Sequence, residues 1–355
     1  MNLLEQTCRE IFPQDNDARS QARARLEQLT MPHWALGDIM DLAVDLAGMS
    51  KSIEPAVEKK IIVTMAGDHG VVAEGVSKFP AEVTPQMVYN IASGGAGINA
   101  LARQAGADVI VVDIGVNADF PDLSGAERFI SRKIAPGTNN IAAGPAMSIA
   151  NARKAVETGI RLALDLAESY DVFGTGEMGI GNTTPSSAIA AVVTGKPVRE
   201  LTGRGTGLDD EQLGKKIAII EKVLEINKPD PQNGLDILAK IGGYEIGGIA
   251  GLILGAAARR KPVVVDGFIS TAGALIAFKL EPFVIDYINC SHRSVEPGHK
   301  YKQETLVCTR PLLYLNFRLG EGTGAALAMN IVEAARRVLT DVATFEEAAV
   351  AQADK

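Results

Sequence analysis

Residues 172–184 (VFGTGEMGIGNTT) join a short apolar run to a helix that begins near Pro185, through a loop with four glycines. The β-branched and aromatic start of this stretch favours a strand. Its glycines leave backbone N–H groups free to surround an anion at a helix N-terminus, and Asn182, Thr183 and Thr184 add side-chain hydrogen bonds and an N-cap. The segment predicts a strand, an anion-binding loop and a helix. Taken alone, the loop could also be only a tight turn.

The same alternation of short strand and longer helix recurs from about residue 60 onward. It is typical of a parallel sheet with crossover helices, whose strand ends form the ligand crevice. The expected strands are residues 61–65, 109–112, 172–174, 263–265 and 284–288. The expected helices are residues 85–91, with Thr84 as N-cap and Pro85 first, then 146–169, 209–226, 246–259 and 323–338.

We therefore expect an α/β protein: a parallel Rossmann-like sheet with flanking helices, plus a small helical domain from the chain termini. Residues 17–29 and 36–49 have helical composition or spacing. The large catalytic domain is expected at residues 59–340 and the small domain at residues 1–58. The tail, residues 341–355, is expected to join the small domain as a further helix.

Composition excludes several classes of function. The apolar runs are too short for the ~20 residues of a membrane span. A net charge of −8 and the lack of a basic run argue against nucleic acid as a partner. The first twelve residues lack a secretory-signal pattern, so we expect a cytoplasmic protein. Cys8, Cys290 and Cys308 are odd in number and widely spaced, so we expect reduced thiols, and no spacing fits a metal site.

A second glycine loop, residues 203–207 (GRGTG), precedes a helix that carries Lys215 and Lys216. Its backbone amides, with Lys216 turned back toward them, would hold a phosphate. The alternative for both lysines is a solvated helix face, which is the common position of lysine.

Three other expected strand ends carry polar residues. Asp68 and His69 follow the first strand, where Asp68 is expected to bind a ligand or make a structural hydrogen bond, because no third group of a catalytic arrangement is in view. Asp266 follows residues 263–265 and could accept a hydrogen bond from a ribose hydroxyl. Ser294 is a candidate phosphate donor in a turn that could otherwise be an ordinary loop.

Glu321 lies between two glycines in residues 318–324 (RLGEGTG), just before an expected helix. The flanking glycines indicate a close approach of backbone to ligand, and no local residue pairs the carboxylate. We expect Glu321 to have a functional role, and it is the best single candidate for a catalytic base. The alternative is that the acid only complements the helix dipole.

Five motifs in this order resemble those of nicotinate-nucleotide:dimethylbenzimidazole phosphoribosyltransferases: residues 66–76, 176–184, 203–210, 291–294 and 318–326. The match extends from about residue 60 to 340. The resemblance implies transfer of phosphoribose from nicotinate mononucleotide to 5,6-dimethylbenzimidazole. The products would be α-ribazole 5′-phosphate, for the lower nucleotide loop of cobalamin, and nicotinate. It also implies no metal or organic cofactor, and a homodimer.

The resemblance assigns roles to residues of this chain. Glu321 falls on the general base. The positions that resemble the nucleotide site are Glu177, Gly179, Gly203, Gly205, Lys216, Asp266 and Ser294. Candidates for the aromatic pocket are Phe79, Gln86, Met87 and Leu319, although Met87 could equally belong to the core.

The chain departs from the family pattern at Phe79, where some members carry a small polar residue. Adenine or a phenol therefore stays open as the acceptor. Two other functions also remain open. One is a nucleotide-dependent oxidoreductase, although the chain lacks the Gly-x-Gly-x-x-Gly fingerprint of that class in the first turn. The other is a non-catalytic nucleotide sensor.

Overall fold

The computed structural model describes residues 1–205, 207–308 and 310–351. A six-stranded sheet has the order β3-β2-β1-β4-β5-β6, and every neighbouring pair is parallel. The strands are β1 (Lys60–Gly67), β2 (Ala107–Gly115), β3 (Phe129–Ser131), β4 (Val172–Met178), β5 (Val263–Val265) and β6 (Ile288–Cys290). The order reverses between β1 and β4, as in doubly wound nucleotide-binding sheets. The expected α/β fold with a parallel Rossmann-like sheet is confirmed.

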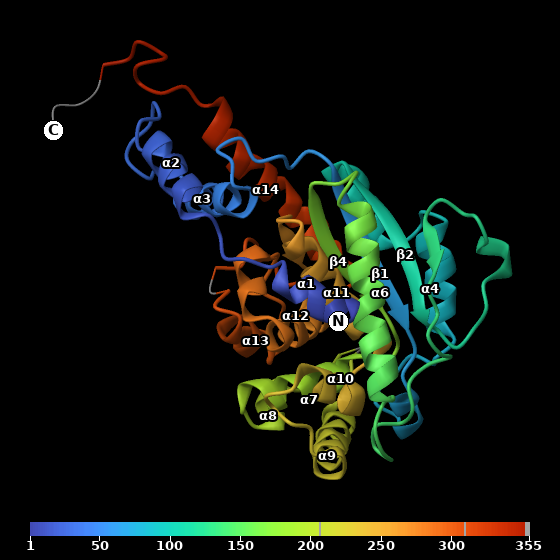
Figure 1. Cartoon of the computed structure of the whole chain (residues 1–355). Coiled ribbons are helices and arrows are strands. Elements are labelled where there is room, and N and C mark those ends of the chain that lie inside the picture. Colours follow the sequence, from blue (N-terminus) through green and yellow to red (C-terminus); the bar gives the residue numbers. More distant parts are fainter. Residues whose placement is uncertain (206, 309, 352–355) are drawn as a thin grey trace.

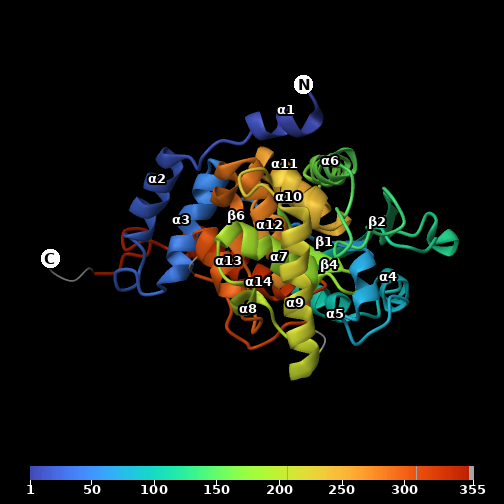
Figure 2. The same cartoon turned by 90° about the horizontal axis from the view of Figure 1, so that it is seen from below.

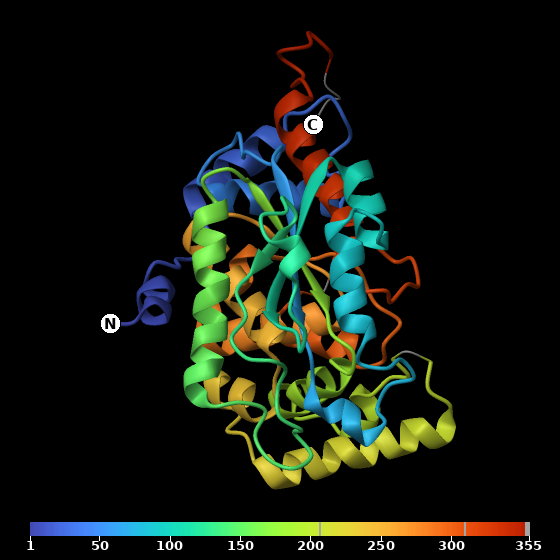
Figure 3. The same cartoon turned by 90° about the vertical axis from the view of Figure 1, so that its right-hand side faces the viewer.

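Helices cover both faces of the sheet. Every residue of β1 is buried, as expected for a central strand between two helical layers. Figure 3 shows α6 on one side of the sheet, and α4 and α5 on the other. The helices of these layers are α4 (Val83–Ala92), α5 (Gly97–Ala105), α6 (Ile149–Leu166), α11 (Tyr244–Ala258) and α14 (Thr323–Asp341). Glycine lets α6 and α11 pack closely, because a Cβ on Gly251 would lie 1.9 Å from the Val156 carbonyl oxygen.

A further helical layer lies at the carboxyl ends of the strands, below the sheet in Figure 1 and facing the viewer in Figure 2. It contains α7 (Thr183–Thr194), α8 (Val198–Leu201), α9 (Asp210–Asn227) and α10 (Gly234–Ile241). Asp209 and Gln212 form a capping box that starts α9, and Gly195 ends α7 at a φ of 69°. The glycine loop that follows β4 therefore connects the sheet to this layer.

The C-terminal tail returns to the N-terminal helices α2 (Asn16–Leu26) and α3 (Asp38–Ser50) beside α14. Both helices pack against α14, whereas α1 (Leu3–Arg9) contacts α6 and α11. The tail returns to this region through a bridge between Leu29 and Thr344 and a 3.0 Å hydrogen bond from Thr30 N to the Ala343 carbonyl. Residues 345–349 form turns instead of the expected helix, and residues 352–355 of that prediction lie outside the described part. The division into two domains stays a prediction.

Two expected boundaries are wrong. Residues 282–287, expected in part as strand, form the 3-10 helix η3 (Pro282–Tyr287), in which Pro282 fixes the first turn and the Glu281 side chain accepts from Phe283 N. Helix α4 begins at Val83, so Thr84 lies inside the helix, where its hydroxyl accepts from Ile180 N at 3.0 Å. The sequence pattern did not predict β3, α5, α10, α12 (Phe268–Leu280) or α13 (His299–Thr305).

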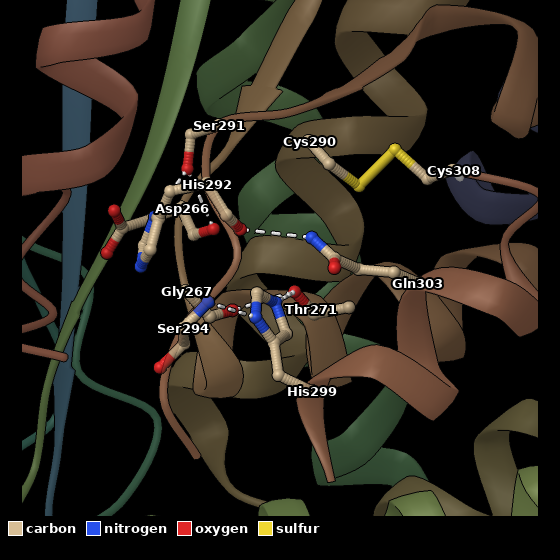
Figure 4. Close-up of a disulfide and its surroundings, with 10 residues drawn as sticks. All are labelled: Asp266, Gly267, Thr271, Cys290, Ser291, His292, Ser294, His299, Gln303 and Cys308. Carbon is tan, nitrogen blue, oxygen red and sulfur yellow. Dashed lines mark hydrogen bonds between the residues drawn. A yellow bond between two sulfur atoms is a disulfide. The ribbon is translucent and has the colours of Figure 1, made fainter. Parts of the chain in front are cut away.

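The expectation of reduced thiols is wrong for two of the three cysteines. Cys290 and Cys308 form a disulfide with their Cα atoms 6.3 Å apart, while Cys8 is free (Figure 4). Cys290 ends β6, and Cys308 N donates to the Gln303 carbonyl at the end of α13. This contact comes from the fold, so the spacing of the cysteines could not show it. Within the described residues, no helix is long and apolar enough to cross a membrane.

Candidate active site

A cavity of about 490 Å³ lies at the carboxyl ends of β4, β5 and β6. Eight of the predicted site residues line it: Phe79, Met87, Glu177, Gly179, Gly205, Ser294, Leu319 and Glu321. Four do not: Gln86, Gly203, Lys216 and Asp266. A larger cavity of about 640 Å³, between α2, α3 and β6, contains none of the predicted residues, so the smaller one is the candidate site.

The loop that carries Glu321 has a left-handed backbone over three successive residues. The φ angles are 87° at Gly320, 63° at Glu321 and 101° at Gly322. Both glycines also permit close packing, because a Cβ on Gly320 would lie 2.3 Å from Glu177 Oε1 and one on Gly322 2.5 Å from Ile62 Cγ2. A glutamate at positive φ costs of order 1–3 kcal/mol, and residues held this way concentrate at functional sites.

The Glu321 carboxylate is buried and has a partner that is distant in the sequence, in keeping with the expectation that no local residue pairs it. Its Oε2 accepts from Ile98 N at 3.1 Å, near the start of α5, and its carbonyl accepts from Thr64 Oγ1 at 2.9 Å. Burial raises the pKa of Glu321, while the Ile98 hydrogen bond opposes the rise. The structure therefore holds a carboxylate of increased basicity in a fixed position on the cavity wall.

Glu177 lies opposite this loop at the end of β4. Asn182 Nδ2 donates to Glu177 Oε2, which explains one polar residue of the glycine loop. Burial, with the nearby Asp266, raises the pKa of Glu177 to about 8. At neutral pH this carboxyl group is mostly protonated, so it can donate a hydrogen bond to a ligand and does not repel a phosphate.

Lys216 lies directly behind the cavity wall. Its Nζ donates to Thr183 Oγ1 at 2.6 Å, and a Cβ on Gly205 would come within 3.4 Å of the same nitrogen. The side chain is 1% exposed, and burial lowers its pKa to about 8. The solvated-face alternative is therefore wrong for Lys216. It fits Lys215, which is exposed and pairs with Glu211 at 2.7 Å.

Besides Lys216, two predicted nucleotide residues lie outside the cavity lining. Asp266 accepts from Gly324 N at 2.7 Å, and also from Gly322 N and Ala325 N, so its carboxylate caps α14 and fixes the Glu321 loop. Burial raises its pKa to about 7. Gly203 packs against Glu296, since a Cβ there would meet Glu296 Oε2 at 1.7 Å. Thr206, in the same predicted loop as Gly203, lies outside the described residues.

His69 has the partner that the sequence did not reveal. Its Nε2 lies 2.8 Å from Glu245 Oε1 in a fully buried pair whose members are 176 positions apart in the chain. Burial lowers the pKa of His69, but the interaction with Glu245 outweighs it and the net shift is upward. Asp68 instead accepts from Asn117 N at 2.8 Å, as a structural hydrogen-bonder.

The other end of the cavity is apolar and open. Phe79 and Leu319 line it with 52% and 60% of their surface exposed, and Val83 and Met87 are half-buried. Gln86 is exposed and does not belong to the lining. We call this group of Phe79, Val83, Met87 and Leu319 the acceptor end, and the group of Glu177, Thr183, Gly205 and Lys216 the nucleotide end.

Sequence reasoning missed several lining residues. Phe268 and Ile269 begin α12 directly after the Asp266–Gly267 strand end, so their position along the chain was the available signal. Arg318 and Glu296 also line the cavity and form an ion pair at 3.7 Å. His292 belongs to a quoted motif, yet nothing in the sequence gave it a role.

Known proteins match this chain closely. A family model described as "Phosphoribosyltransferase" matches residues 11–350. The nicotinate-nucleotide–dimethylbenzimidazole phosphoribosyltransferase of Desulfotalea psychrophila is 66% identical over 355 residues, all of both chains. That of Syntrophotalea carbinolica is 58% identical over 352 residues, 99% of each. A crystal structure of CobT from Thermus thermophilus superimposes with a TM-score of 0.90 at 42% identity, covering 95% of this chain and 100% of that one. The chain therefore belongs to the nicotinate-nucleotide–dimethylbenzimidazole phosphoribosyltransferase family.

Proposed function

We propose that this enzyme transfers 5-phosphoribose from nicotinate mononucleotide to 5,6-dimethylbenzimidazole in the assembly of the cobalamin nucleotide loop. The products are α-ribazole 5′-phosphate and nicotinate. The observation that carries the proposal is the position of Glu321, a buried carboxylate of raised pKa on the wall of a cavity with one apolar end and one polar end. The printed names of the relatives describe the same two substrates.

Glu321 acts as the general base. One benzimidazole nitrogen bonds to ribose C1′ while the other nitrogen gives its proton to the Glu321 carboxylate, which makes the attacking nitrogen more electron-rich. The bond from C1′ to the nicotinate nitrogen breaks, and the bonding electrons leave with nicotinate. Attack from the face opposite the leaving group turns the β-linked nucleotide into an α-linked product. These bond changes balance without a metal or an organic cofactor, so we propose neither.

The nucleotide end holds the phosphate and ribose in line for this attack. The phosphate lies near the start of α7, where the Lys216 ammonium donates to Thr183 Oγ1 close to Gly205 and the helix dipole favours an anion. Ser294 and the protonated Glu177 donate further hydrogen bonds. Gly179 leaves room for the backbone to approach the nucleotide.

The acceptor end takes the flat aromatic base. Its side chains are apolar and can adapt to rings of similar size. Adenine and phenols should therefore be assayed as competitors of dimethylbenzimidazole. We assign no contact to Gln86, which is exposed and away from the lining.

We further propose that the enzyme is a homodimer. Large apolar side chains are exposed on the segment that precedes Leu319, where Tyr314 is 62% and Leu315 58% exposed. A second copy would cover them. Light scattering on the eluting protein tests this, and a monomer at micromolar concentration would contradict it.

We place the enzyme in the cytoplasm, because its phosphorylated substrate does not cross a bilayer unaided. The Cys290–Cys308 disulfide would be uncommon in that compartment. Rapid alkylation of thiols in freshly lysed cells measures whether the pair is oxidised there.

The reaction is tested with the purified chain, nicotinate mononucleotide and dimethylbenzimidazole. Chromatography should show nicotinate and α-ribazole 5′-phosphate in equal amounts. A chain that binds the nucleotide without releasing nicotinate would be a sensor. Reduction of a nicotinamide cofactor, followed by its absorbance, would instead indicate an oxidoreductase.

A further inference from the structure

His292 is a neutral imidazole with a defined tautomer. Ser291 Oγ donates to the Asp266 carbonyl at 2.9 Å, so its hydroxyl proton is already used. The 2.9 Å contact between Ser291 Oγ and His292 Nδ1 must therefore be donated by the ring (Figure 4). Burial lowers the pKa of His292 to about 4, so the ring carries a proton on Nδ1 alone at neutral pH.

The other ring nitrogen, Nε2, is a hydrogen-bond acceptor without a partner among the described residues. His292 is 1% exposed, and a buried acceptor without a donor is unfavourable. His292 is one of the residues that line the candidate active-site cavity. Its Cε1–Nε2 edge lies beside Gly267, another lining residue, since a Cβ on Gly267 would be 3.3 Å from Cε1 and 3.5 Å from Nε2.

The ring is also held rigidly. It stacks on Phe317 with the ring centroids 4.0 Å apart and an interplanar angle of 17°. A Cβ on Gly324 would lie 2.2 Å from Nδ1, so the start of α14 closes over the ring. The unpaired lone pair is therefore fixed in position before any ligand arrives.

We propose that His292 Nε2 accepts a hydrogen bond from a ribose hydroxyl of the bound nucleotide and so positions the sugar for attack at C1′. This inference rests on the proposed function. An ionised phosphate and the carboxylate of nicotinate have no proton to donate, and the benzimidazole N–H is directed to Glu321. The ribose hydroxyls are the donors that remain.

The position of Asp266 supports this assignment. The sequence suggested Asp266 as the ribose acceptor, but both of its oxygens accept backbone N–H groups at the start of α14 and it lies outside the cavity lining. His292 lies next to Asp266 and lines the cavity, and its Nε2 is an acceptor without a partner among the described residues.

A matched control is present in the same network. His299 is also fully buried, and its pKa is lowered by burial, but both of its nitrogens are satisfied. Ser294 N donates to Nδ1 at 2.9 Å, and Nε2 lies 2.9 Å from Thr271 Oγ1. His299 should therefore matter for structure and not for recognition of a hydroxyl.

The experiment measures calorimetric affinity for nicotinate mononucleotide and for its 2′-deoxy and 3′-deoxy analogues. The wild type should bind at least one analogue about tenfold more weakly than the natural nucleotide. His292→Phe, which keeps an aromatic ring on Phe317, should remove that preference. His299→Phe should keep it, even if overall affinity or stability falls. Equal discrimination by wild type and His292→Phe, or none by the wild type, overturns the proposal.

A second measurement uses the unmodified protein, in case His292→Phe does not fold. The chain has four histidines. The ¹⁵N signal of an unprotonated Nε2 can be separated from that of an unprotonated Nδ1, such as the one of His299, by its couplings to the ring protons. The Nε2 signal should move when nicotinate mononucleotide binds and move less with the discriminating analogue. An unchanged signal on saturation overturns the proposal.

Neither measurement depends on turnover. Failure of Glu321 as the base would appear only in the rate of nicotinate release and would leave the hydroxyl preference intact. Absence of the preference in the wild type, or its retention in His292→Phe, together with normal turnover would reject the role of His292 and leave the proposed function intact.

Discussion

The two ends of the cavity differ in burial and in what holds them. At the nucleotide end, Glu177 and Lys216 are at most 6% exposed and have their partners in place. At the acceptor end, Phe79 and Leu319 are more than half exposed. A preorganised polar end fixes the atoms that react, whereas an open apolar end only selects by shape. Changes near Glu321 and at the nucleotide end should therefore alter rate or affinity strongly, and changes at the acceptor end should alter preference weakly.

Glu321→Gln should give the largest effect. The amide retains size and can still accept from Ile98 N, but it cannot take the proton from the acceptor base. Turnover should fall by roughly 10²–10⁴, the usual contribution of a general base, while nucleotide affinity stays within about twofold. Rapid-quench measurement of nicotinate release and calorimetry give the two values.

Glu82→Gln is the control for that change, because Glu82 is exposed beside α4 and caps nothing with its side chain. It should leave turnover unaltered. If Glu321→Gln retained wild-type turnover, Glu321 would be only a complement to the local helix ends.

Lys216→Met should have the next largest effect. Methionine keeps the length of the buried side chain and removes the charge near Thr183 and Gly205. Affinity for nicotinate mononucleotide should fall by about 10–100-fold, as expected for the loss of a hydrogen bond to a charged group. Lys215→Met should change affinity little, because that side chain is exposed and pairs with Glu211. Equal losses of affinity in the two variants would mean that only the net charge of the protein affects binding, and not the position of Lys216.

Glu177→Gln should change how stability depends on pH. The pKa of Glu177 rises from 4.5 to about 8 on folding, so the folded state keeps a proton that the unfolded state releases between these values. The free energy of unfolding should therefore fall as pH rises through this window, and Glu177→Gln should flatten that fall. Urea denaturation of both proteins at pH 5, 6.5 and 8 measures the difference. Parallel curves would show that Glu177 does not carry the proton.

Local residue patterns predicted the sheet and most of the loops that form the cavity. They did not predict which distant residues contact one another. β-branched runs gave β1, β2, β4 and β5 because such residues favour strands wherever they are buried. The glycines around Glu321 identified its loop, and the positive φ angles explain why they are needed. Ile98, Glu245 and the Cys290–Cys308 pair could not be found, because those contacts join segments that local patterns do not bring together.

The predicted element boundaries were wrong where neighbouring residues outweighed the strand propensity of the segment. Val284 and Ile285 favour a strand by composition, but Pro282 and the Glu281 side chain start the 3-10 helix η3 before β6. Asp266 was expected to face the nucleotide because it ends a strand. The start of α14, which residue patterns alone could not place beside β5, accounts for its hydrogen bonds.

Phe79→Ser should give the smallest effect and test the acceptor end directly. Phe79 lines the acceptor end, and about half of its surface is exposed, so its removal exposes little new apolar area to water. A side chain that only contacts the edge of an aromatic ring should shift the ratio of kcat/KM between dimethylbenzimidazole and adenine by about tenfold or less. The KM for nicotinate mononucleotide should not move, because the nucleotide end is unchanged. A competition assay with both bases present measures the ratio from the two products. A shift well above about a hundredfold would mean that the acceptor end is as preorganised as the nucleotide end, and the contrast between the two ends would then fail.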